Sequence, residues 1–212
     1  MRGKTPTPLA GDRLVSPSAE RNKGPISSVL KEVLPPNGLV LEISSGTGQH
    51  IVYFAREMPD LIWQPSECDA RSLALIGHWM GEADLENVRP PLLLDVTEQP
   101  WPVASADAVV CLNMIHIAPW PATEALIRGA RDVLSAGGLL FLYGPFRRHG
   151  RHTADSNEAF DRSLRSRDPA WGVRDLEEVA RVAAAHGFGS PAIHEMPANN
   201  LSVVFARLSD AV

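Results

Sequence analysis

Cysteine is scarce in this sequence, and the two cysteines that it has do not form a recognisable motif. Cys68 and Cys111 lie far apart, so the CxxC spacing of zinc and redox sites is missing. We expect both thiols to be free and buried at strand ends, which is common in proteins of a reducing compartment. The sequence therefore predicts a cytoplasmic protein without a bound metal.

Long apolar stretches are also missing. No apolar run approaches the ~20 residues that a membrane-spanning helix requires. Residues 1–24 lack the apolar core of a signal peptide. We therefore expect no membrane partner.

The chain has no excess of positive charge. Its 20 lysines and arginines are outnumbered by 25 aspartates and glutamates, which gives a net charge of −5. Because nucleic-acid binding requires clustered cations, this balance argues against a nucleic-acid partner and favours a small-molecule ligand. A short basic cluster, residues 147–152, is predicted to form a solvated loop. The composition leaves open whether the chain is a monomer or a homodimer.

Strand and helix patterns alternate along the 212 residues, which suits an α/β domain. Residues 1–17, rich in proline, glycine and threonine, are predicted to form an irregular arm before a domain at 18–212. The predicted strands are residues 39–43, 61–64, 91–96, 106–114 and 139–143, followed by a hairpin of 192–196 and 201–208. The predicted helices are residues 25–34, 47–58, 70–82, 123–134 and 174–186, with Gly137-Gly138 closing the fourth. Ser18 is an alternative cap for the first helix, but it would place Pro25 inside that helix.

This alternation predicts a mostly parallel sheet with helices on both faces, closed by an antiparallel hairpin. Ligands of such folds bind beyond the carboxyl ends of the strands, so the residues just after each strand are the candidates for a site. Residues 145–172 interrupt the pattern. They predict either a lid or wall over a substrate pocket, with Phe160 and Trp171 packed over the substrate, or a plain cover for the sheet edge.

A glycine-rich turn follows the first predicted strand. Gly46 and Gly48 allow a sharp backbone turn and a close approach of a ligand to the main chain. The third glycine of a dinucleotide-binding fingerprint is missing, which argues against NAD or FAD. Taken alone, this turn is equally compatible with an ordinary strand-to-helix connection.

Carboxylates follow the next two predicted strands. Glu67 is placed to accept the two hydroxyls of a ribose, while Asp69 is better explained as the cap of the following helix. Asp95 is placed to accept the exocyclic amine of adenine, or it forms a turn. The three features share one sheet edge in the order that a nucleoside requires. Together they favour an adenosine ligand without phosphates, of which S-adenosylmethionine is the most common.

The ends of the fourth and fifth predicted strands carry further candidates. Asn113 is placed to face the methionine part of the cofactor or the substrate. His116 is either a general base or, more often for such a histidine, a hydrogen-bonded structural residue. Tyr143 either orients a substrate nucleophile or covers the cofactor.

Longer stretches of the chain resemble one known family. They are residues 18–26, 41–50, 63–67, 94–96, 113–116, 143–146 and 196–201, together with Asn157, Phe160, Asp161, Trp171, Gly172, Arg174 and Asp175. In order and spacing, over roughly residues 15–208, they resemble the DUF938 (UPF0585) family, of the methyltransferase-like 26 type. The resemblance implies a class I S-adenosylmethionine-dependent methyltransferase with a Rossmann-like fold. That fold has a seven-stranded, mostly parallel sheet, an antiparallel C-terminal hairpin and helices on both faces.

The residues and the resemblance together define the predicted site. The cofactor is S-adenosylmethionine, with S-adenosylhomocysteine as product, and its predicted ligands are Asn22, Glu42, Ser44, Gly46, Thr47, Gly48, His50, Glu67, Asp95, Val96 and Asn113. His116 and Tyr143 are the predicted catalytic residues. The predicted substrate residues are Arg21, Lys23, Asn157, Asp161, Trp171, Arg174, Asn199 and Asn200.

The expected reaction is methyl transfer to a small-molecule acceptor by in-line displacement, which depends mainly on alignment of the reacting groups. Two alternatives stay open at this point. A macromolecule methyltransferase acting on RNA would need a basic and aromatic surface that this sequence does not offer. A non-catalytic S-adenosylmethionine-binding protein with a regulatory or interaction role would need only the cofactor residues.

Overall fold

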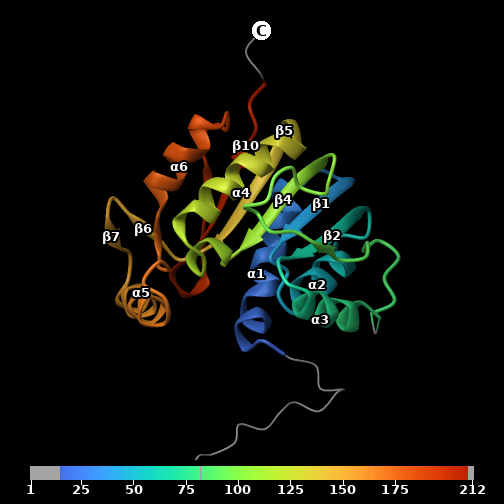
Figure 1. Ribbon diagram of the computed structural model, residues 1–212, viewed down its shortest axis with the longest axis horizontal. Coiled ribbons are helices and arrows are strands. Elements are labelled where there is room, and N and C mark those ends of the chain that lie inside the picture. The colour runs from blue at the N-terminus through green and yellow to red at the C-terminus, as the bar shows by residue number, and fades with distance from the viewer. Residues whose placement is uncertain (1–14, 82, 210–212) are drawn as a thin grey trace, which may run out of the picture.

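A seven-stranded sheet runs through the centre of the protein, in a computed structural model that describes residues 15–81 and 83–209 (Figure 1). Its strands are β1 (Gly38–Ile43), β2 (Leu61–Glu67), β3 (Leu92–Leu93), β4 (Ala106–Leu112), β5 (Leu134–Gly144), β9 (Ala192–Met196) and β10 (Asn200–Ala206). The helices are α1 (Pro17–Val33), α2 (Gln49–Glu57), α3 (Ala70–Gly81), α4 (Trp120–Val133), α5 (Asp155–Arg167) and α6 (Leu176–Ala185). None of these described helices is long and apolar enough to cross a membrane. Short 3-10 turns, η1 (Met114–His116) and η2 (Pro197–Asn199), follow β4 and β9.

The strand order in the sheet is β3-β2-β1-β4-β5-β10-β9. The strands from β3 to β5 pair in parallel, and β10 runs antiparallel to both of its neighbours. This confirms the predicted parallel sheet and C-terminal hairpin. The chain moves outward from β1 to β3 and then returns to β4 on the other side of β1. In folds of this kind, ligands bind at such a switch point, which here lies at the carboxyl ends of β1 and β4.

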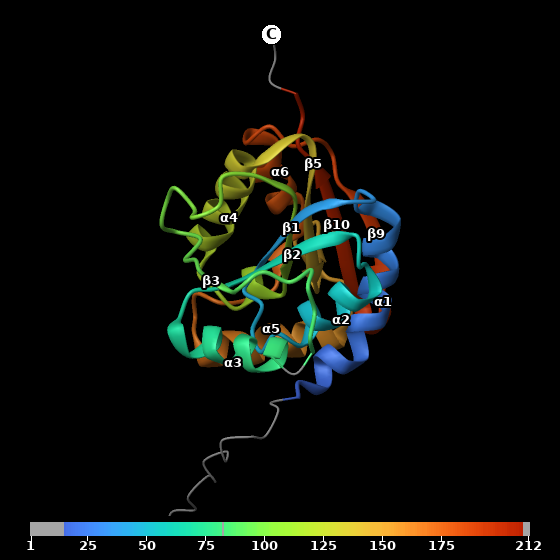
Figure 2. The ribbon, with the colours of Figure 1, turned by 90° about the vertical axis from the view of Figure 1, so that its right-hand side faces the viewer.

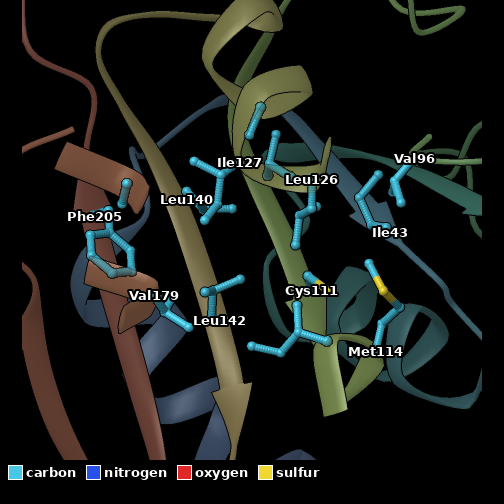
Figure 3. Close-up of a cluster of buried hydrophobic side chains, with 14 of the residues drawn as sticks. Ile43, Val96, Cys111, Met114, Leu126, Ile127, Leu140, Leu142, Val179 and Phe205 are labelled. Atoms are coloured by element: carbon cyan, nitrogen blue, oxygen red, sulfur yellow. The ribbon is translucent and has the colours of Figure 1, made fainter. Parts of the chain in front are cut away.

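Side chains of the central strands alternate between two apolar cores. Val109 and Cys111 of β4 belong to a core shared with α4 and α6, which Figure 3 shows. Ala108 and Val110 belong to a second core, shared with α1, α2 and α3. Because helices cover both faces, the strands are apolar on both sides, and a ligand has access mainly at the strand ends.

The first helix begins earlier than predicted. α1 starts at Pro17 and is capped by Ser16, whose Oγ accepts a hydrogen bond from the Ala19 amide at 3.3 Å. The predicted start at Pro25 and the alternative cap at Ser18 are therefore both wrong. Proline is well suited to the first helical position, because the amide that it lacks would have no partner there.

Pro25 is accommodated inside α1. It removes one backbone hydrogen bond, but Ile26 and Leu30 beyond it are fully buried against the sheet. Tertiary packing therefore outweighs the local cost of the proline. Of the predicted arm, residues 1–14 lie outside the described residues, and Pro17 already belongs to α1.

Two further boundaries differ from the predictions. α4 ends with Leu134 as its C-cap, and β5 begins at the same residue, so Gly137-Gly138 does not close the helix. Gly137 has a φ of +82° within β5, where the pairing with β4 shifts register. The glycine serves an irregularity in the strand rather than a helix end. The strand predicted at 91–96 pairs only at β3, which leaves Asp95 and Val96 beyond it.

Residues 145–172 form a structured insert rather than an interruption. A three-stranded sheet, in the order β7-β6-β8, joins β6 (Phe146–Arg148), β7 (Arg151–His152) and β8 (Arg174–Asp175), with α5 beside it (Figure 1). His149 and Gly150 form the turn between β6 and β7 with φ values of +51° and +76°, as a type I′ hairpin requires. The solvated loop predicted for residues 147–152 is therefore wrong, because these residues pair as a hairpin.

Both cysteines are free, but their surroundings differ. Cys111 is buried within β4, as predicted. Cys68 is exposed, so the prediction of a buried thiol is wrong there. It follows the last residue of β2 in the bend that leads to α3, where neither core covers it.

Candidate functional site

The turn between β1 and α2 has an unusual backbone. Ser44, Gly46 and Gly48 have φ values of +57°, +61° and +87°. A positive φ is strained for a serine, and such strain is concentrated at ligand sites. A Cβ on Gly46 would meet no atom within 4 Å, whereas a Cβ on Gly48 would lie 3.1 Å from Ile76 Cα of α3. Gly48 is thus required for helix packing, and Gly46 leaves its backbone open to a ligand.

Hydrogen bonds join this turn to the end of β2. The Ser45 amide donates to the Ser66 carbonyl at 2.9 Å, and Ser66 Oγ donates to the Glu42 carbonyl at 2.7 Å. The Gly46 amide donates to Glu67 Oε1 at 2.8 Å. The structure therefore brings together Gly46 and Glu67, which the sequence predicted to share a site. Ser45 and Ser66 had not been predicted, and their small hydroxyl side chains at the strand ends were the only signal.

Glu42 is a buried carboxyl beside this turn. It is only 1% exposed, and its Oε2 has no hydrogen-bond partner among the described residues. Burial raises its pKa to about 7, and the charge of Glu67 adds to this effect, while a hydrogen bond with Ser45 opposes it. An unsatisfied buried acceptor at a strand end suits a ligand that carries a donor or a positive charge.

The two remaining carboxylates of this sheet edge, Asp69 and Asp95, have different hydrogen-bond partners. Asp69 accepts hydrogen bonds from the Arg71 and Ser72 amides at 3.0 Å each, so it caps α3. Asp95 is exposed, and its Oδ1 accepts from the amide and hydroxyl of Thr97 at 2.8 and 2.7 Å. Its Oδ2 has no partner in the described residues, so the turn that Asp95 forms leaves one oxygen for a ligand.

Helix α1 packs across the beginning of α2 and is joined to it by polar contacts. His50 Nε2 donates to Asn22 Oδ1 at 2.8 Å, since that oxygen can only accept. Asn22 also bonds to the hydroxyl of Tyr143 at the end of β5. Gln49, which the sequence reasoning missed, donates to Glu20 and accepts the Ser16 amide at 2.8 Å. These contacts hold α1 against α2, so α1 forms a wall beside the candidate site; Figure 2 shows the two helices side by side.

Burial controls the ionisation of two groups on this wall. It lowers the pKa of His50 to about 4, with Lys23 adding to the shift and Glu20 opposing it. It also raises the pKa of Tyr143, against its hydrogen bond with Asn22. At neutral pH, His50 is therefore uncharged and Tyr143 keeps its proton.

His116 lies in the protein interior. It is fully buried, its Nδ1 accepts the Arg174 amide at 3.3 Å, and its ring meets Phe146 edge-on at 5.1 Å. Burial and the Arg174 charge lower its pKa to about 3, so it is neutral at physiological pH. Asn113, whose φ is +63°, receives the His116 amide on its carbonyl at 3.0 Å. These contacts favour the structural alternative for His116, and its role as a base stays a prediction.

The predicted substrate residues separate into two groups. Arg21 is exposed on α1, and Lys23 there pairs with Glu20 at 2.7 Å. The second group lies in the insert and around η2, where its side chains form hydrogen bonds with neighbouring parts of the chain. Asn157 donates to the Asn199 carbonyl at 2.9 Å. Asp161 accepts from Arg165 and from the Val173 amide, and Asn199 donates to Ser156. The Asn200 side chain donates to the carbonyl of Pro197, three residues earlier.

Arg174 holds loop carbonyls rather than facing open space. Its Nε donates to the Ile115 carbonyl at 2.8 Å, and its Nη2 donates to the carbonyls of Ala118 and Ala170 at 2.5 and 2.9 Å. Its guanidinium also lies 5.7 Å from the Trp120 ring centroid. Trp171 is half-buried, with the Arg167 guanidinium 5.8 Å from its ring centroid.

Known proteins resemble this chain in sequence pattern and in fold. A family model described as "Protein of unknown function (DUF938)" matches residues 13–207. The apo form of the S-adenosylmethionine-dependent methyltransferase SibL superposes with a TM-score of 0.76 at 19% identity, covering 91% of this chain and 56% of that chain. An O-methyltransferase family protein from Burkholderia thailandensis has a TM-score of 0.77 at 16% identity, with coverages of 92% and 58%. Human N-acetylserotonin methyltransferase in complex with SAM has a TM-score of 0.76 at 12% identity, with coverages of 91% and 53%.

The chain spans little more than half the length of these solved structures. At such low identity the likeness shows the fold, and it agrees with the observed strand order and closing hairpin. The protein therefore has the Rossmann-like fold of S-adenosylmethionine-dependent methyltransferases, and it belongs to the DUF938 family.

Proposed function

We propose that this protein is an S-adenosylmethionine-dependent methyltransferase that methylates a small-molecule acceptor by in-line displacement. The observation that carries the proposal is the contact between the open backbone at Gly46 and the carboxylate of Glu67. It supports a ribose site at Glu67, because a turn with an open backbone lies beside this carboxylate at the switch point of the sheet.

Four side chains along this edge would hold an adenosine ligand. Glu67 would accept the ribose hydroxyls, and the free oxygen of Asp95 would accept the adenine amine. The unsatisfied Oε2 of Glu42 and the side chain of Asn113 would meet the methionine tail. The turn offers no third glycine to a pyrophosphate, so the site fits a nucleoside better than a dinucleotide.

The bound cofactor supplies an electrophilic methyl group, and the protein must align an acceptor with it. Proximity and orientation can supply ~7–11 kcal/mol of such a barrier without acid–base chemistry. Tyr143, protonated at neutral pH, would donate a hydrogen bond that orients the acceptor. We assign His116 a positioning role, because its neutral ring holds the turn after β4 against the Arg174 backbone.

The insert would form the wall of the acceptor site opposite α1. α5 is fixed at one end, because Asn157 donates to both Thr153 Oγ1 at 3.0 Å and the Asn199 carbonyl. These ties favour a rigid wall over a mobile lid. Phe160 is 38% exposed on α5 and Trp171 is half-buried, so both remain available to an apolar acceptor.

Two measurements test the proposal. Turnover with a radiolabelled methyl donor and a panel of metabolites tests catalysis, and calorimetry with S-adenosylmethionine tests binding. Labelled product is expected from at least one small molecule. Tight cofactor binding without any labelled product would instead support a non-catalytic binding protein.

A further inference from the structure

Three arginines and a histidine lie where the insert meets the central sheet. Asp161, a buried carboxylate on α5, accepts from Arg165 Nε at 2.9 Å and lies 3.7 Å from His152 Nε2. Arg174 lies close enough for its pKa to be lowered by the charges of Arg165 and Arg147, in addition to burial. Arg165, Arg174 and His152 therefore surround one buried carboxylate, Asp161, and Arg147 lies near Arg174, so the cluster of Arg147, His152, Arg165 and Arg174 has three arginines around a single carboxylate.

Two members of this cluster have buried polar atoms with no partner. Arg147 Nε and His152 Nδ1 are inaccessible to water and form no hydrogen bond with any residue of 15–81 or 83–209. Arg147 and His152 are directly opposite each other in the β6–β7 ladder, so their side chains lie on one face, toward Asp161. Buried donors without acceptors are rare in native proteins and indicate a missing partner.

Nearby acidic side chains are already engaged elsewhere. Asp175, opposite Arg147 in the β6–β8 ladder, accepts the Gly150 amide at 2.6 Å. Glu177 accepts Arg148 Nε at 3.1 Å and the His149 amide at 2.8 Å. These carboxylates hold the hairpin turn and leave Arg147 without an ion pair in the described structure.

The position of the cluster relates it to the proposed acceptor site. Phe146, the residue before Arg147, packs on His116, which follows the end of β4. The Gly172 amide donates to the His116 carbonyl at 2.9 Å, and a Cβ on Gly172 would lie 2.7 Å from Asp161 Oδ1. The cluster therefore lies beside the carboxyl ends of β4 and β5, on the opposite side from the Gly46 turn (Figure 1).

We propose that this cluster binds the oxyanion of a small acidic methyl acceptor, a carboxylate or a phosphate, with Arg147 as its main donor and His152 beside it. The planar guanidinium suits such groups, because it forms parallel hydrogen bonds to two oxygens. Only the identification of the ligand as a methyl acceptor rests on the proposed function. The anion site itself is a property of the insert and is testable without the cofactor.

The test uses the full-length protein labelled with ¹⁵N, and benzoate, phenyl phosphate and uncharged benzamide as probes. The arginine Nε–Hε signal of Arg147, identified by its loss in Arg147→Gln, reports on the site. We expect benzoate or phenyl phosphate to shift this signal in a saturable manner, and benzamide to leave it unchanged. Whichever acid binds more tightly shows whether the site prefers a carboxylate or a phosphate. The Arg147→Gln variant is expected to bind that acid about tenfold more weakly or worse.

A matched variant separates the site from general charge effects. Arg162→Gln removes an exposed arginine of α5 that pairs with Glu158, and it should leave acid binding unchanged. Arg147→Lys keeps the charge and should restore part of the affinity lost in Arg147→Gln, which also covers the case that the glutamine variant does not fold.

Three results would overturn the anion site: no shift of the Arg147 signal with either acid, equal binding of benzamide, or unchanged acid affinity in Arg147→Gln. Calorimetry with S-adenosylmethionine on the same samples keeps the two proposals apart. Acid binding without cofactor binding would refute the proposed methyltransferase function and support the anion site. Cofactor binding without acid binding would refute the anion site and leave the proposed function standing.

Discussion

The carboxyl edge of the sheet has two sides, one at the turn between β1 and α2 and one at the insert, and they are built in different ways. On the proposed cofactor side, the turn at 44–48 meets Glu67 through backbone amides and short side chains on adjacent parallel strands. On the insert side, long charged side chains reach across the fold, as in the bond from Arg174 to the Ile115 carbonyl, 59 residues away in the chain. The first side depends on local backbone conformation, and the second depends on tertiary pairing of charges. Substitutions should therefore affect cofactor binding on the first side, and stability on the second side wherever the charged side chain already has partners, as Arg174 does.

The largest expected effect is on stability, from Arg174→Met. This change removes three hydrogen bonds to loop carbonyls and the contact with Trp120. Because hydrogen bonds from a charged donor contribute more than neutral ones, we expect the free energy of unfolding to fall by about 4 kcal/mol. Chemical denaturation measures this, with Arg162→Met as the exposed control. A variant of unchanged stability that loses acceptor binding would return Arg174 to the substrate role that the sequence predicted.

The next effect is on cofactor binding, from Glu67→Ala. Loss of an acceptor for both ribose hydroxyls should weaken S-adenosylmethionine binding about a hundredfold, close to 3 kcal/mol. Calorimetry measures this, with circular dichroism to verify the fold. Asp69→Ala is the matched control: it removes the α3 cap, lowers stability and leaves affinity unchanged. Full affinity in the double variant Glu67→Ala, Asp95→Ala would refute the site.

Glu42 should make the cofactor side sensitive to pH. Its pKa is raised to about 7 in the folded protein from 4.5, so between these values the folded state keeps a proton that the unfolded state has lost. The free energy of unfolding should therefore fall as pH rises, by about 2 kcal/mol between pH 5 and pH 7 from this group.

Glu42→Gln keeps the shape without the charge and should remove this part of the pH dependence. The comparison is made by denaturation at both pH values without cofactor. The exposed Glu98 supplies the control variant Glu98→Gln, which should behave as the wild type. Identical pH slopes in wild type and Glu42→Gln would show that the carboxyl is not held neutral by burial.

The smallest expected effect comes from replacing one glycine on each side. Gly46 and Gly150 both have positive φ and open space where a Cβ would lie, so replacing either by alanine should cost about 1 kcal/mol of stability. Only Gly46→Ala should also weaken S-adenosylmethionine binding, because only that Cβ would project into the ligand turn. Parallel melting and calorimetry of the two variants test this. Equal cofactor affinity in both would show that the turn at Gly46 does not approach the ligand.

The sequence predicted the sheet well, because each strand is a short apolar run and each crossover is a helix with its own stop signals. It also predicted that Gly46 and Glu67 lie at one edge of the sheet, since parallel strands end at one edge, and the structure joins them by a hydrogen bond. The start of α1 was missed, because Pro25 is a strong local signal that the packing of Ile26 and Leu30 outweighs.

The insert was hardest to predict, because a charged side chain does not reveal its partner in the sequence. Arg147 and His152 resembled solvent-exposed residues, and Arg174 resembled a substrate ligand. One signal was available: His149-Gly150 between two short runs is close to the Asn-Gly pattern of a type I′ turn, and it would have placed Arg147 opposite His152. Which carboxylates remain for them depends on Asp161, Asp175 and Glu177, and only the fold decides that.

Titration calorimetry of the wild-type protein with S-adenosylmethionine and S-adenosylhomocysteine tests the central claim most directly. The account predicts saturable heat at one site per chain for both ligands, with NAD giving none. Absence of heat with either adenosyl ligand, together with clear binding of NAD, would contradict it.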